Sequence, residues 1–298
     1  MNAARRRKRR GEGSGRLVRA GPQVHSARLA DQGAAEPQLL RRLFARAAPA
    51  KSPPAPSTAG ELVYAVGDIH GRLDLLEGLI GRIRSDAAHT NAQTRPILIF
   101  IGDYVDRGPQ SRGVIDAILA LQDEGLFEVR TLKGNHEEQL LAFLKDPREG
   151  AAWLQFGGAD TLLSYGIIPP AGRTDPESWE ATRLAFQAVL PSSHRAFLEG
   201  LELAIVCGDY LFVHAGVRPG VPLTEQSEHD LLWIRDDFLS STRAIEKIVV
   251  HGHTPEPAPH IGRNRIGIDT GAYATGTLTA VRLAGADQTI LQADRPAR

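Results

Sequence analysis

Five short polar clusters in this sequence combine aspartate, histidine and asparagine in patterns that could hold metal ions. Three of them read GDIHG at 67–71, GDYVDRG at 102–108 and GNHE at 134–137. Two more, HAG at 214–216 and GHTP at 252–255, follow towards the C-terminus. Imidazole, carboxylate and amide groups together suit Mn²⁺, iron or Zn²⁺ better than Ca²⁺ or a metal that prefers thiolates. The residue types therefore indicate a metal site with mixed nitrogen and oxygen ligands.

The types of these residues are compatible with two metal ions. Asp68 and His70 are two residues apart on an extended stretch, so that both side chains can face the same side. Asp103 can bridge two ions through its carboxylate. Three residues of the later clusters can complete the shell of a second ion: Asn135, His214 and His253. Two divalent ions about 3.5–4 Å apart form the two-metal arrangement that many hydrolases use.

The charge of such a centre favours a phosphate group as its substrate. Two divalent cations outweigh the negative charges of Asp68, Asp103 and a bridging hydroxide, and neutral ligands leave this balance unchanged. Arg107 and Arg235 add further positive charge. Arginine also matches the geometry of phosphate oxygens through its paired N–H donors.

Each cluster follows a segment with the pattern of a buried strand. These predicted strands are Leu62–Val66, Ile97–Ile101, Phe127–Leu132, Tyr210–Val213 and Ile248–Val250. Further strands are predicted at Leu203–Val206, Arg265–Asp269, Thr277–Arg282 and Thr289–Gln292, and helical patterns lie between the early strands. Ligand sites in α/β sheets lie outside the carboxyl ends of the strands, so we expect the clusters to meet in one crevice of an α/β layered domain.

The five clusters, in this order, resemble the motifs of the calcineurin-like metallophosphoesterases. More narrowly, GDxHG, GDxxDRG, GNHE, HAG and GHTP resemble small bacterial and phage-type members of the phosphoprotein phosphatase family. The resemblance extends from about residue 61 to about residue 283. It implies an α/β fold, a four-layer α-β-β-α sandwich of two mixed sheets, with a dinuclear metal centre at the strand ends. It implies two divalent metal ions as cofactors, with Mn²⁺ favoured over iron or Zn²⁺.

The resemblance also implies which residues bind the metal ions. The first ion has three ligands: Asp68, His70 and Asp103. The second ion shares Asp103 and has three further ligands: Asn135, His214 and His253. The implied mechanism is a single in-line attack on phosphorus by a hydroxide that bridges the two ions, without a phosphoenzyme.

Catalytic and substrate-binding roles follow from the same resemblance. His136 would be the general acid that protonates the leaving alkoxide, and Asp106 would orient it and stabilise its charged form. Arg107 would bind the substrate phosphoryl oxygens, together with Asn135, and Arg235 would be a second phosphate-binding arginine. Tyr273 would line the pocket.

The leading prediction is an enzyme that hydrolyses phosphomonoesters on serine or threonine of proteins. The alternative is a symmetrical diadenosine tetraphosphate hydrolase, whose family shares the metal core but usually reads GNHD. GNHE and the intact DRG at 106–108 favour the phosphatase. A nuclease of the wider superfamily would usually carry GHxH, and position 255 is proline here. An inactive phosphatase-like binding protein is a further alternative, which the complete set of ligands disfavours.

Charge divides the chain of 298 residues at about residue 60. Residues 1–60 contain 13 Lys and Arg against 3 Asp and Glu, include the run Arg5–Arg10 and end in the Pro-rich stretch Ser52–Pro56. This composition predicts a disordered basic arm, with helical spacing only around Gln38–Ala48. Residues 61–298 are predicted to form the metallophosphatase domain, with a helical insertion at about 146–200 that could cover the site.

Composition also bears on partners and location. No stretch reaches the ~18 consecutive apolar residues of a transmembrane helix, so no membrane span is predicted. Residues 61–298 contain 22 Lys and Arg against 32 Asp and Glu, and this acidic composition disfavours nucleic acid as a partner, apart from weak contact by the basic arm. The predicted partner is a phosphoprotein. The lone cysteine, Cys207, excludes an internal disulfide framework and fits a cytoplasmic location. The sequence predicts no particular oligomeric state.

Several residues near or outside the motifs are predicted to be structural. Glu137 is expected in the first turn of a helix, where an acid suits the helix dipole. His251 precedes the GHTP motif and matches no ligand position. The remaining histidines match no motif and are predicted to lie on the surface: His25, His89, His194, His229 and His260.

Overall fold

The computed structural model describes residues 55–90, 94–171 and 175–295. The chain divides into two units, Met1–Pro53 and Pro54–Arg298, and the description below concerns the second unit. Most of the predicted basic arm, including Arg5–Arg10 and the helical spacing at Gln38–Ala48, lies outside the described residues.

The first sheet has five strands in the order β10-β9-β1-β2-β3. Their bounds are Leu62–Val66 for β1, Ile97–Phe100 for β2, Glu128–Thr131 for β3, Thr277–Ala284 for β9 and Asp287–Asp294 for β10. β1 pairs in parallel with β2, and β2 with β3, whereas β9 is antiparallel to both β1 and β10. The sheet is therefore mixed, and the three parallel strands end at one edge.

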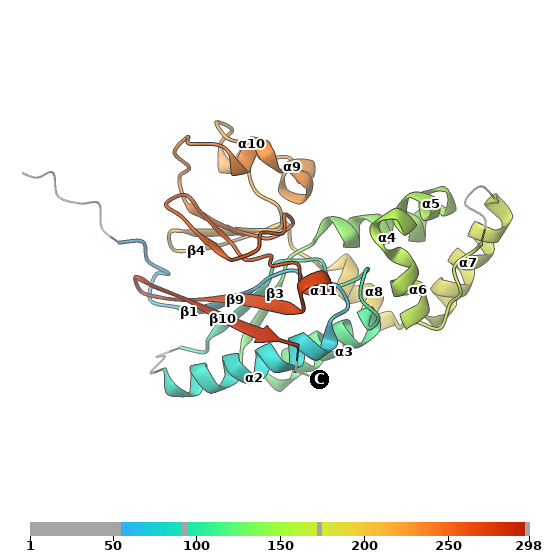
Figure 1. Ribbon diagram of the computed structural model, residues 1–298, viewed down its shortest axis with the longest axis horizontal. Coiled ribbons are helices and arrows are strands. Elements are labelled where there is room, and N and C mark those ends of the chain that lie inside the picture. The colour runs from blue at the N-terminus through green and yellow to red at the C-terminus, as the bar shows by residue number, and fades with distance from the viewer. Residues whose placement is uncertain (1–54, 91–93, 172–174, 296–298) are drawn as a thin grey trace, which may run out of the picture. The chain divides into compact units, whose positions relative to one another are not determined.

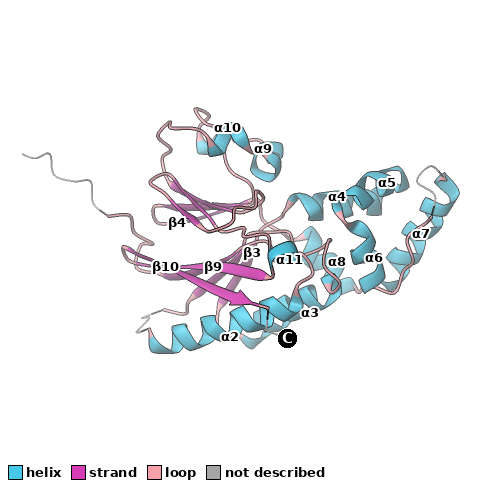
Figure 2. Ribbon diagram, in the orientation of Figure 1, coloured by secondary structure: helices cyan, strands magenta, loops and turns pink. Residues whose placement is uncertain are grey.

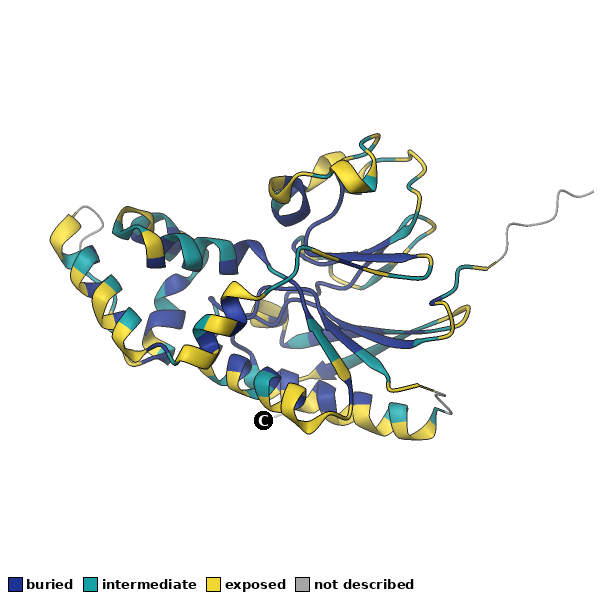
Figure 3. Cartoon of the chain, turned by 180° about the vertical axis from the view of Figure 1, so that it is seen from behind, coloured by how far each residue is buried: buried dark blue, intermediate teal, exposed yellow. Residues whose placement is uncertain are grey.

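Two helices cover the outer face of this sheet, as Figure 1 shows for α2 and α3. α2 spans Leu73–His89 and α3 spans Ser111–Glu124. Their apolar residues recur at helical spacing, for example Leu75, Leu79 and Ile83 on α2, and all three are buried. In Figure 3 the buried residues of the two helices lie towards the sheet and the exposed residues lie outwards.

The second sheet has the order β4-β5-β6-β8-β7. Its strands are β4 at Ala204–Cys207, β5 at Tyr210–Val213, β6 at Ile248–His251, β7 at His260–Ile261 and β8 at Arg265–Gly267. β5, β6 and β8 are parallel, and the two edge strands are antiparallel to their neighbours. Two short helices, α9 at Glu228–Trp233 and α10 at Asp236–Leu239, pack on its outer face through Leu231 and Phe238.

The inner faces of the two sheets share one hydrophobic core. Val63 and Ile99 of the first sheet pack in the same buried cluster as Phe212, Val250 and Ile266 of the second. The layers therefore run helix, sheet, sheet, helix (Figure 2), which confirms the predicted four-layer sandwich of two mixed sheets. The sheets also touch along one edge, where the residues after β3 bond to Glu202.

Helices fill the chain between β3 and β4. They are α4 at Asn135–Lys145, η1 at Pro147–Glu149, α5 at Gly150–Trp153, η2 at Leu154–Phe156, α6 at Gly158–Ser164, α7 at Pro176–Val189 and α8 at Ser192–Glu199. Their aromatic residues pack together. The centre of the Trp153 ring lies 5.1 Å from that of Phe143, on which it stacks, and 6.3 Å from that of Phe186. Two short helices complete the described elements: η3 at Leu223–Glu225 and α11 at Ala272–Thr275.

The sequence predicted most strands to within two residues of their observed bounds. β7 has only two residues, and its alternation is too short to predict. The strand predicted to end at Asp269 ends at Gly267, because the following residues turn into the polar site. No helix among the described residues has the length and hydropathy needed to cross a membrane.

One histidine predicted to be on the surface is buried. The His194 side chain is 1% exposed on α8. Its Nδ1 lies 2.7 Å from the Tyr165 hydroxyl and its Nε2 lies 2.8 Å from an Asp116 carboxylate oxygen. The prediction for His194 is wrong because these partners, Tyr165 just after α6 and Asp116 on α3, are 29 and 78 residues away in the sequence.

Candidate metal centre

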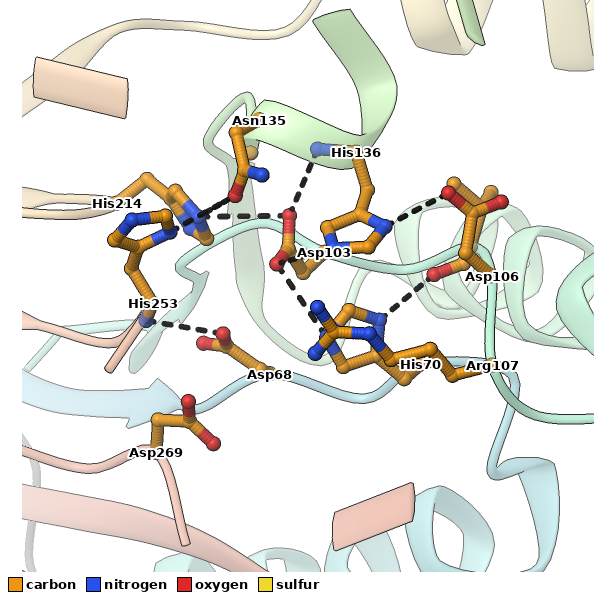
Figure 4. Close-up of polar contacts among 12 residues, drawn as sticks. Asp68, His70, Asp103, Asp106, Arg107, Asn135, His136, His214, His253 and Asp269 are labelled. Atoms are coloured by element: carbon orange, nitrogen blue, oxygen red, sulfur yellow. Dashed lines mark hydrogen bonds and ion pairs between the residues drawn. The ribbon is translucent and has the colours of Figure 1, made fainter. Parts of the chain in front are cut away.

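The five polar clusters meet where β1, β2, β5 and β6 end and α4 begins (Figure 4). The structure brings all six predicted metal ligands together, and each is at most 4% exposed. They are Asp68, His70, Asp103, Asn135, His214 and His253. Parallel strands deliver the residues that follow them to one edge of the sheet, which explains why distant motifs converge.

Asp103 lies at the centre of the cluster. One of its carboxylate oxygens is 3.4 Å from Nε2 of His70, and the other is 3.5 Å from Nε2 of His214. The ligand atoms of His70, Asp103 and His136 lie within 4.8 Å of one another, and so do those of Asp103, His214 and His253. Asp103 belongs to both groups, which is the position that a bridging carboxylate requires.

Backbone carbonyls fix the orientation of two imidazole rings. Nδ1 of His70 lies 2.9 Å from the carbonyl oxygen of Val105, and Nδ1 of His214 lies 2.9 Å from that of Ile101. A carbonyl can only accept, so Nδ1 carries the proton in both rings, and Nε2, beside Asp103, keeps a lone pair that can bind a cation. Histidines that bind metals in proteins are held in this way.

Unpaired buried atoms in the cluster fit a bound cation. Within the described ranges, three buried side-chain atoms have no hydrogen-bond partner, and two of them belong to the cluster: Oδ1 of Asp68 and Nε2 of His253. Burial and the nearby charges of Asp269 and Asp103 raise the pKa of Asp68 well above its usual value. A divalent cation would satisfy the unpaired atoms and neutralise the crowded carboxylates, so the donor set fits a metal.

Burial keeps the ring nitrogens available as ligands. It lowers the pKa of His70 to about 3 and that of His253 to about 2, and it also lowers the pKa of His214. All three rings are therefore neutral near pH 7, the form in which imidazole binds metals.

Two glycines of the motifs allow the backbone to approach the carboxylates. A Cβ atom at Gly134 would lie 2.1 Å from Oδ1 of Asp103, and one at Gly252 would lie 2.0 Å from Oδ1 of Asp68. No side chain fits at either position without moving a candidate ligand. The glycines of GNHE and GHTP are therefore needed for the shape of the site.

The loops that carry the side chains have an unusual backbone conformation. Five residues of the site have positive φ: His70 at 46°, Asp103 at 53°, Asp106 at 71°, Arg107 at 66° and His253 at 66°. Only one other non-glycine residue in the described chain, Ala59, shares this feature. Such conformations cost energy in residues with a side chain, and they gather at functional sites.

His136 and Asp106 form a buried pair beside the centre. Nδ1 of His136 lies 2.7 Å from Oδ2 of Asp106, and both side chains are at most 1% exposed. Burial disfavours the charged imidazole, but the negative charges of Asp103 and Asp106 outweigh it and raise the pKa of His136. Asp106 also accepts hydrogen bonds from Trp153 and Thr161, two contacts that the sequence motifs did not indicate.

The predicted substrate-binding residues lie on two sides of the cluster. The guanidinium carbon of Arg107 lies 4.7 Å from the centre of the Tyr273 ring, and its Nη1 lies 3.1 Å from Nε2 of His70. Arg235 is exposed, and it donates to the carbonyl oxygen of His253 and to the Thr254 hydroxyl. Arg107 and Tyr273 thus border the His70 side, and Arg235 borders the His253 side.

Glu137 has a larger role than the sequence analysis gave it. It lies in the first turn of α4, as predicted, but it is fully buried. Its Oε2 accepts from the backbone N–H groups of Asp103 and Gly134, both at 2.9 Å, and its Oε1 accepts from Tyr104 N–H at 2.8 Å. One carboxylate therefore ties together two of the loops that form the site.

Asp269 is a further buried carboxyl that the motifs did not indicate. It follows β8 and is labelled next to Asp68 in Figure 4. Burial raises its pKa to about 6, while the Gly271 N–H bonds to it at 2.8 Å. The only sequence signal was its place after an apolar run, the position that the other site carboxylates also occupy.

Comparison with known proteins agrees with this geometry. The sequence pattern of the family described as calcineurin-like phosphoesterase matches residues 62–277. A curated relative from Anoxybacillus flavithermus, named bis(5'-nucleosyl)-tetraphosphatase PrpE (asymmetrical), is 26% identical over 239 residues, covering 73% of this chain and 88% of the relative. A relative of the same name from Geobacillus thermodenitrificans is 28% identical over 244 residues, with the same coverage.

Solved structures share the fold at lower sequence identity. A chain assigned as a diadenosine tetraphosphatase is 20% identical, has a TM-score of 0.54 and aligns over 80% of this chain and 98% of that one. A cold-active protein-tyrosine phosphatase from a Shewanella species is 17% identical with a TM-score of 0.51, over 78% of this chain and 80% of that one. The family pattern covers most of the chain, so the chain belongs to the calcineurin-like phosphoesterases, and its motif residues gather in one buried cluster that could hold a metal ion.

Proposed function

We propose that this chain hydrolyses phosphomonoesters with two divalent metal ions. Asp68, His70 and Asp103 would hold the first ion, and Asp103 would share the second ion with three further ligands. Those ligands are Asn135, His214 and His253. Bound metal ions would polarise the phosphoryl oxygens and lower the pKa of a water molecule at the site. We propose Mn²⁺ as the first metal to test, with iron and Zn²⁺ as alternatives.

The remaining residues of the site bind the substrate and move one proton. Arg107 and Arg235 would contact the phosphoryl oxygens from opposite sides, with Tyr273 beside Arg107. As the bond between phosphorus and the leaving oxygen breaks, its electron pair goes to that oxygen, which takes a proton from Nε2 of His136. The hydroxyl that completes the phosphate comes from water, and the other proton of that water would return to Nε2 of His136 and restore the acid. Asp106 would keep Nδ1 of His136 protonated throughout.

The buried pair of His136 and Asp106 is the observation that carries the choice of substrate. A serine or threonine alkoxide is a poor leaving group, and its departure needs a proton in the transition state. A nucleotide that leaves from a phosphoanhydride carries its negative charge more easily and needs an acid less. A site with a built proton donor therefore supports phosphoserine or phosphothreonine in proteins as the substrate class.

A dinucleoside tetraphosphate is the second candidate substrate. It is favoured by the names of the curated relatives, which describe asymmetrical cleavage rather than the symmetrical cleavage considered in the sequence analysis. The two reactions give different products, because symmetrical cleavage yields two nucleoside diphosphates and asymmetrical cleavage yields a triphosphate and a monophosphate.

A side-by-side assay separates the two candidates. The full chain would be loaded with Mn²⁺ and given a phosphoserine or phosphothreonine peptide, or diadenosine tetraphosphate, with and without a chelator. We expect metal-dependent release of phosphate from the peptide at the higher kcat/KM. Preference for diadenosine tetraphosphate would instead support the second candidate, and the products would show which phosphoanhydride bond of the substrate is cleaved.

Location and domain roles complete the proposal. We infer a cytoplasmic enzyme, since Cys207 is the only cysteine and is unpaired. Residues 61–298 would carry the activity, with the helices at about 146–200 as an insertion beside the site. Residues 1–60 would be a basic arm outside the catalytic domain, able to make weak contact with nucleic acid.

A further inference from the structure

The helices that follow α4 supply two hydrogen-bond donors to Asp106. Trp153, the last residue of α5, donates from Nε1 to Oδ2 of Asp106 at 3.0 Å. Thr161, within α6, donates from its hydroxyl to Oδ1 at 2.6 Å. Together with His136, these residues satisfy both oxygens of a fully buried carboxylate. Asp106 therefore has one orientation in which every contact is made.

Thr161 also holds the main chain of Asp106. The Asp106 N–H donates to the Thr161 hydroxyl at 2.8 Å and lies 3.1 Å from the Ser111 hydroxyl. The Thr161 hydroxyl thus accepts from the backbone and donates to the side chain of the same residue. This matters because Asp106 has a φ of 71°, a conformation that needs support from its neighbours.

Trp153 is itself held in place. Its ring stacks on that of Phe143, with 5.1 Å between ring centres and 26° between planes, and on that of Phe186, with 6.3 Å and 28°. A Cβ atom at Gly158 would lie 2.5 Å from the same ring, so the backbone of α6 packs directly against it. The indole N–H is therefore aimed at Asp106 by the aromatic core of the helical segment.

The same segment contacts the neighbouring arginine. The Arg107 N–H donates to the carbonyl oxygen of Gly157 at 3.2 Å, and a Cβ atom at Gly157 would lie 2.7 Å from that nitrogen. Residues 153–161 thus contact both Asp106, which would orient His136, and Arg107, which would face the substrate.

We propose that Trp153 and Thr161 are positioning residues for proton delivery by His136. They act through Asp106, whose carboxylate must stay in line with Nδ1 of His136 so that Nε2 points at the leaving oxygen. The helical segment that contains Trp153 and Thr161 would then help to orient the general acid. The proposal rests on the assignment of His136 as the general acid.

The test compares substrates that differ in their need for a proton. Thr161→Val keeps the shape of the side chain and removes the hydroxyl, and Trp153→Phe keeps an aromatic ring and removes the N–H. Thr161→Ser restores a hydroxyl. Thr182→Val, also buried and hydrogen-bonded within a helix of the same region, is the matched control. Each variant, loaded with Mn²⁺, is assayed on para-nitrophenyl phosphate, which has a good leaving group, and on a phosphoserine peptide, which has a poor one.

We expect Thr161→Val and Trp153→Phe to lower kcat on the phosphoserine peptide by about 10-fold, the worth of one hydrogen bond to a charged group. On para-nitrophenyl phosphate kcat should change less than about 3-fold. Thr161→Ser should recover most of the loss, and Thr182→Val should behave as the wild type on both substrates. Equal losses on the two substrates would overturn the proposal, because they would indicate general damage to the site.

The same substitutions in a chain that lacks His136 test separately whether Thr161 acts through His136 and whether His136 is the general acid. In a chain that already carries His136→Asn, Thr161→Val should cause no further loss on the peptide, since both changes remove the same proton transfer. Additive losses would contradict a role through His136. If His136→Asn alone lowered kcat on both substrates equally, His136 would not be the general acid. Both that assignment and the positioning role would then be wrong.

Discussion

At the scale of single residues, the shape of the site depends on two buried carboxylates, Asp106 and Glu137, that accept hydrogen bonds at both oxygens. Glu137 shows this best, because Oε1 faces the N–H groups of Tyr104 and Val105, and Oε2 faces those of Asp103 and Gly134. All four hydrogen bonds described at this carboxylate come from backbone N–H donors. An amide in its place must turn its NH₂ group towards N–H donors, which it cannot pair with.

Glu137→Gln should therefore loosen the loop that carries Asp103. We expect metal affinity to fall about 10–100-fold, the usual effect of removing a group that orients a ligand. A metal titration followed by calorimetry measures this, with the exposed Glu124→Gln on α3 as the control. Unchanged metal affinity in Glu137→Gln would show that the four N–H contacts do not position Asp103.

His136→Asn should separate catalysis from metal binding. Loss of a general acid lowers kcat by about 10²–10⁴-fold. His136 has Nδ1 on Asp106, and its Nε2 lies 3.8 Å from Asp103, farther than the corresponding atoms of His70 and His214. Metal content, measured by elemental analysis, should stay the same. A variant that lost its metal would show that His136 is a ligand and not the acid.

At the scale of elements, strand ends and tight loops place the ligands. The alternation of apolar runs and polar clusters was enough to predict every described strand but β7, an α/β layered domain and the meeting of the five motifs, whereas the sandwich of two mixed sheets was implied by the family resemblance. The left-handed conformations at Asp103, Asp106 and Arg107 could not be predicted, since these residues rarely adopt positive φ without tertiary support. Their support comes from loops and helices elsewhere in the chain.

Contacts between distant helices were also beyond the sequence. Trp153 and Thr161 reach Asp106 across 47 and 55 residues, and their pairing depends on how α5 and α6 fold back onto the site. Periodicity shows which face of a helix is apolar, but not which polar group of another element it meets. The same reason made the surface prediction for His194 wrong.

Gly252→Ala tests the close approach of the loop after β6 to Asp68. The added Cβ would lie 2.0 Å from Oδ1 of Asp68 and 2.8 Å from the Ile101 side chain, so the loop that carries His253 must move. We expect metal affinity and turnover to fall by at least about ten-fold.

The matched control for this change is Gly81→Ala, in the middle of α2, where nothing lies within 4 Å of an added Cβ. That variant should bind metal normally and be more stable than the wild type by about 0.5–1 kcal/mol, because alanine favours the helix. Normal metal binding by Gly252→Ala would contradict the packing described for the site.

At the scale of the whole molecule, the chain just before β1 already belongs to the folded unit. Ser57 exchanges hydrogen bonds with Asp209 at 2.8 and 2.9 Å, and the fully buried Thr58 accepts from the thiol of Cys207. These contacts fasten the start of the first sheet to the β4–β5 turn of the second.

A chain that begins at Glu61 should therefore be less stable than one that begins at Ala55. Loss of these hydrogen bonds predicts a decrease of about 1–3 kcal/mol in the free energy of unfolding. Urea unfolding of the two chains, with metal content matched, measures the difference. Equal midpoints and slopes would show that residues 55–60 contribute nothing to the folded unit.

The central claim is that one buried cluster, shared through Asp103, holds two metal ions and hydrolyses phosphate esters. The most direct measurement counts metal ions and turnover together in the wild type and in Asp103→Asn, after loading with Mn²⁺ and removal of excess metal. We expect two ions for each wild-type chain, turnover that disappears with a chelator, and loss of both ions and activity in Asp103→Asn. Full turnover in the presence of the chelator, or unchanged metal content in Asp103→Asn, would contradict the account.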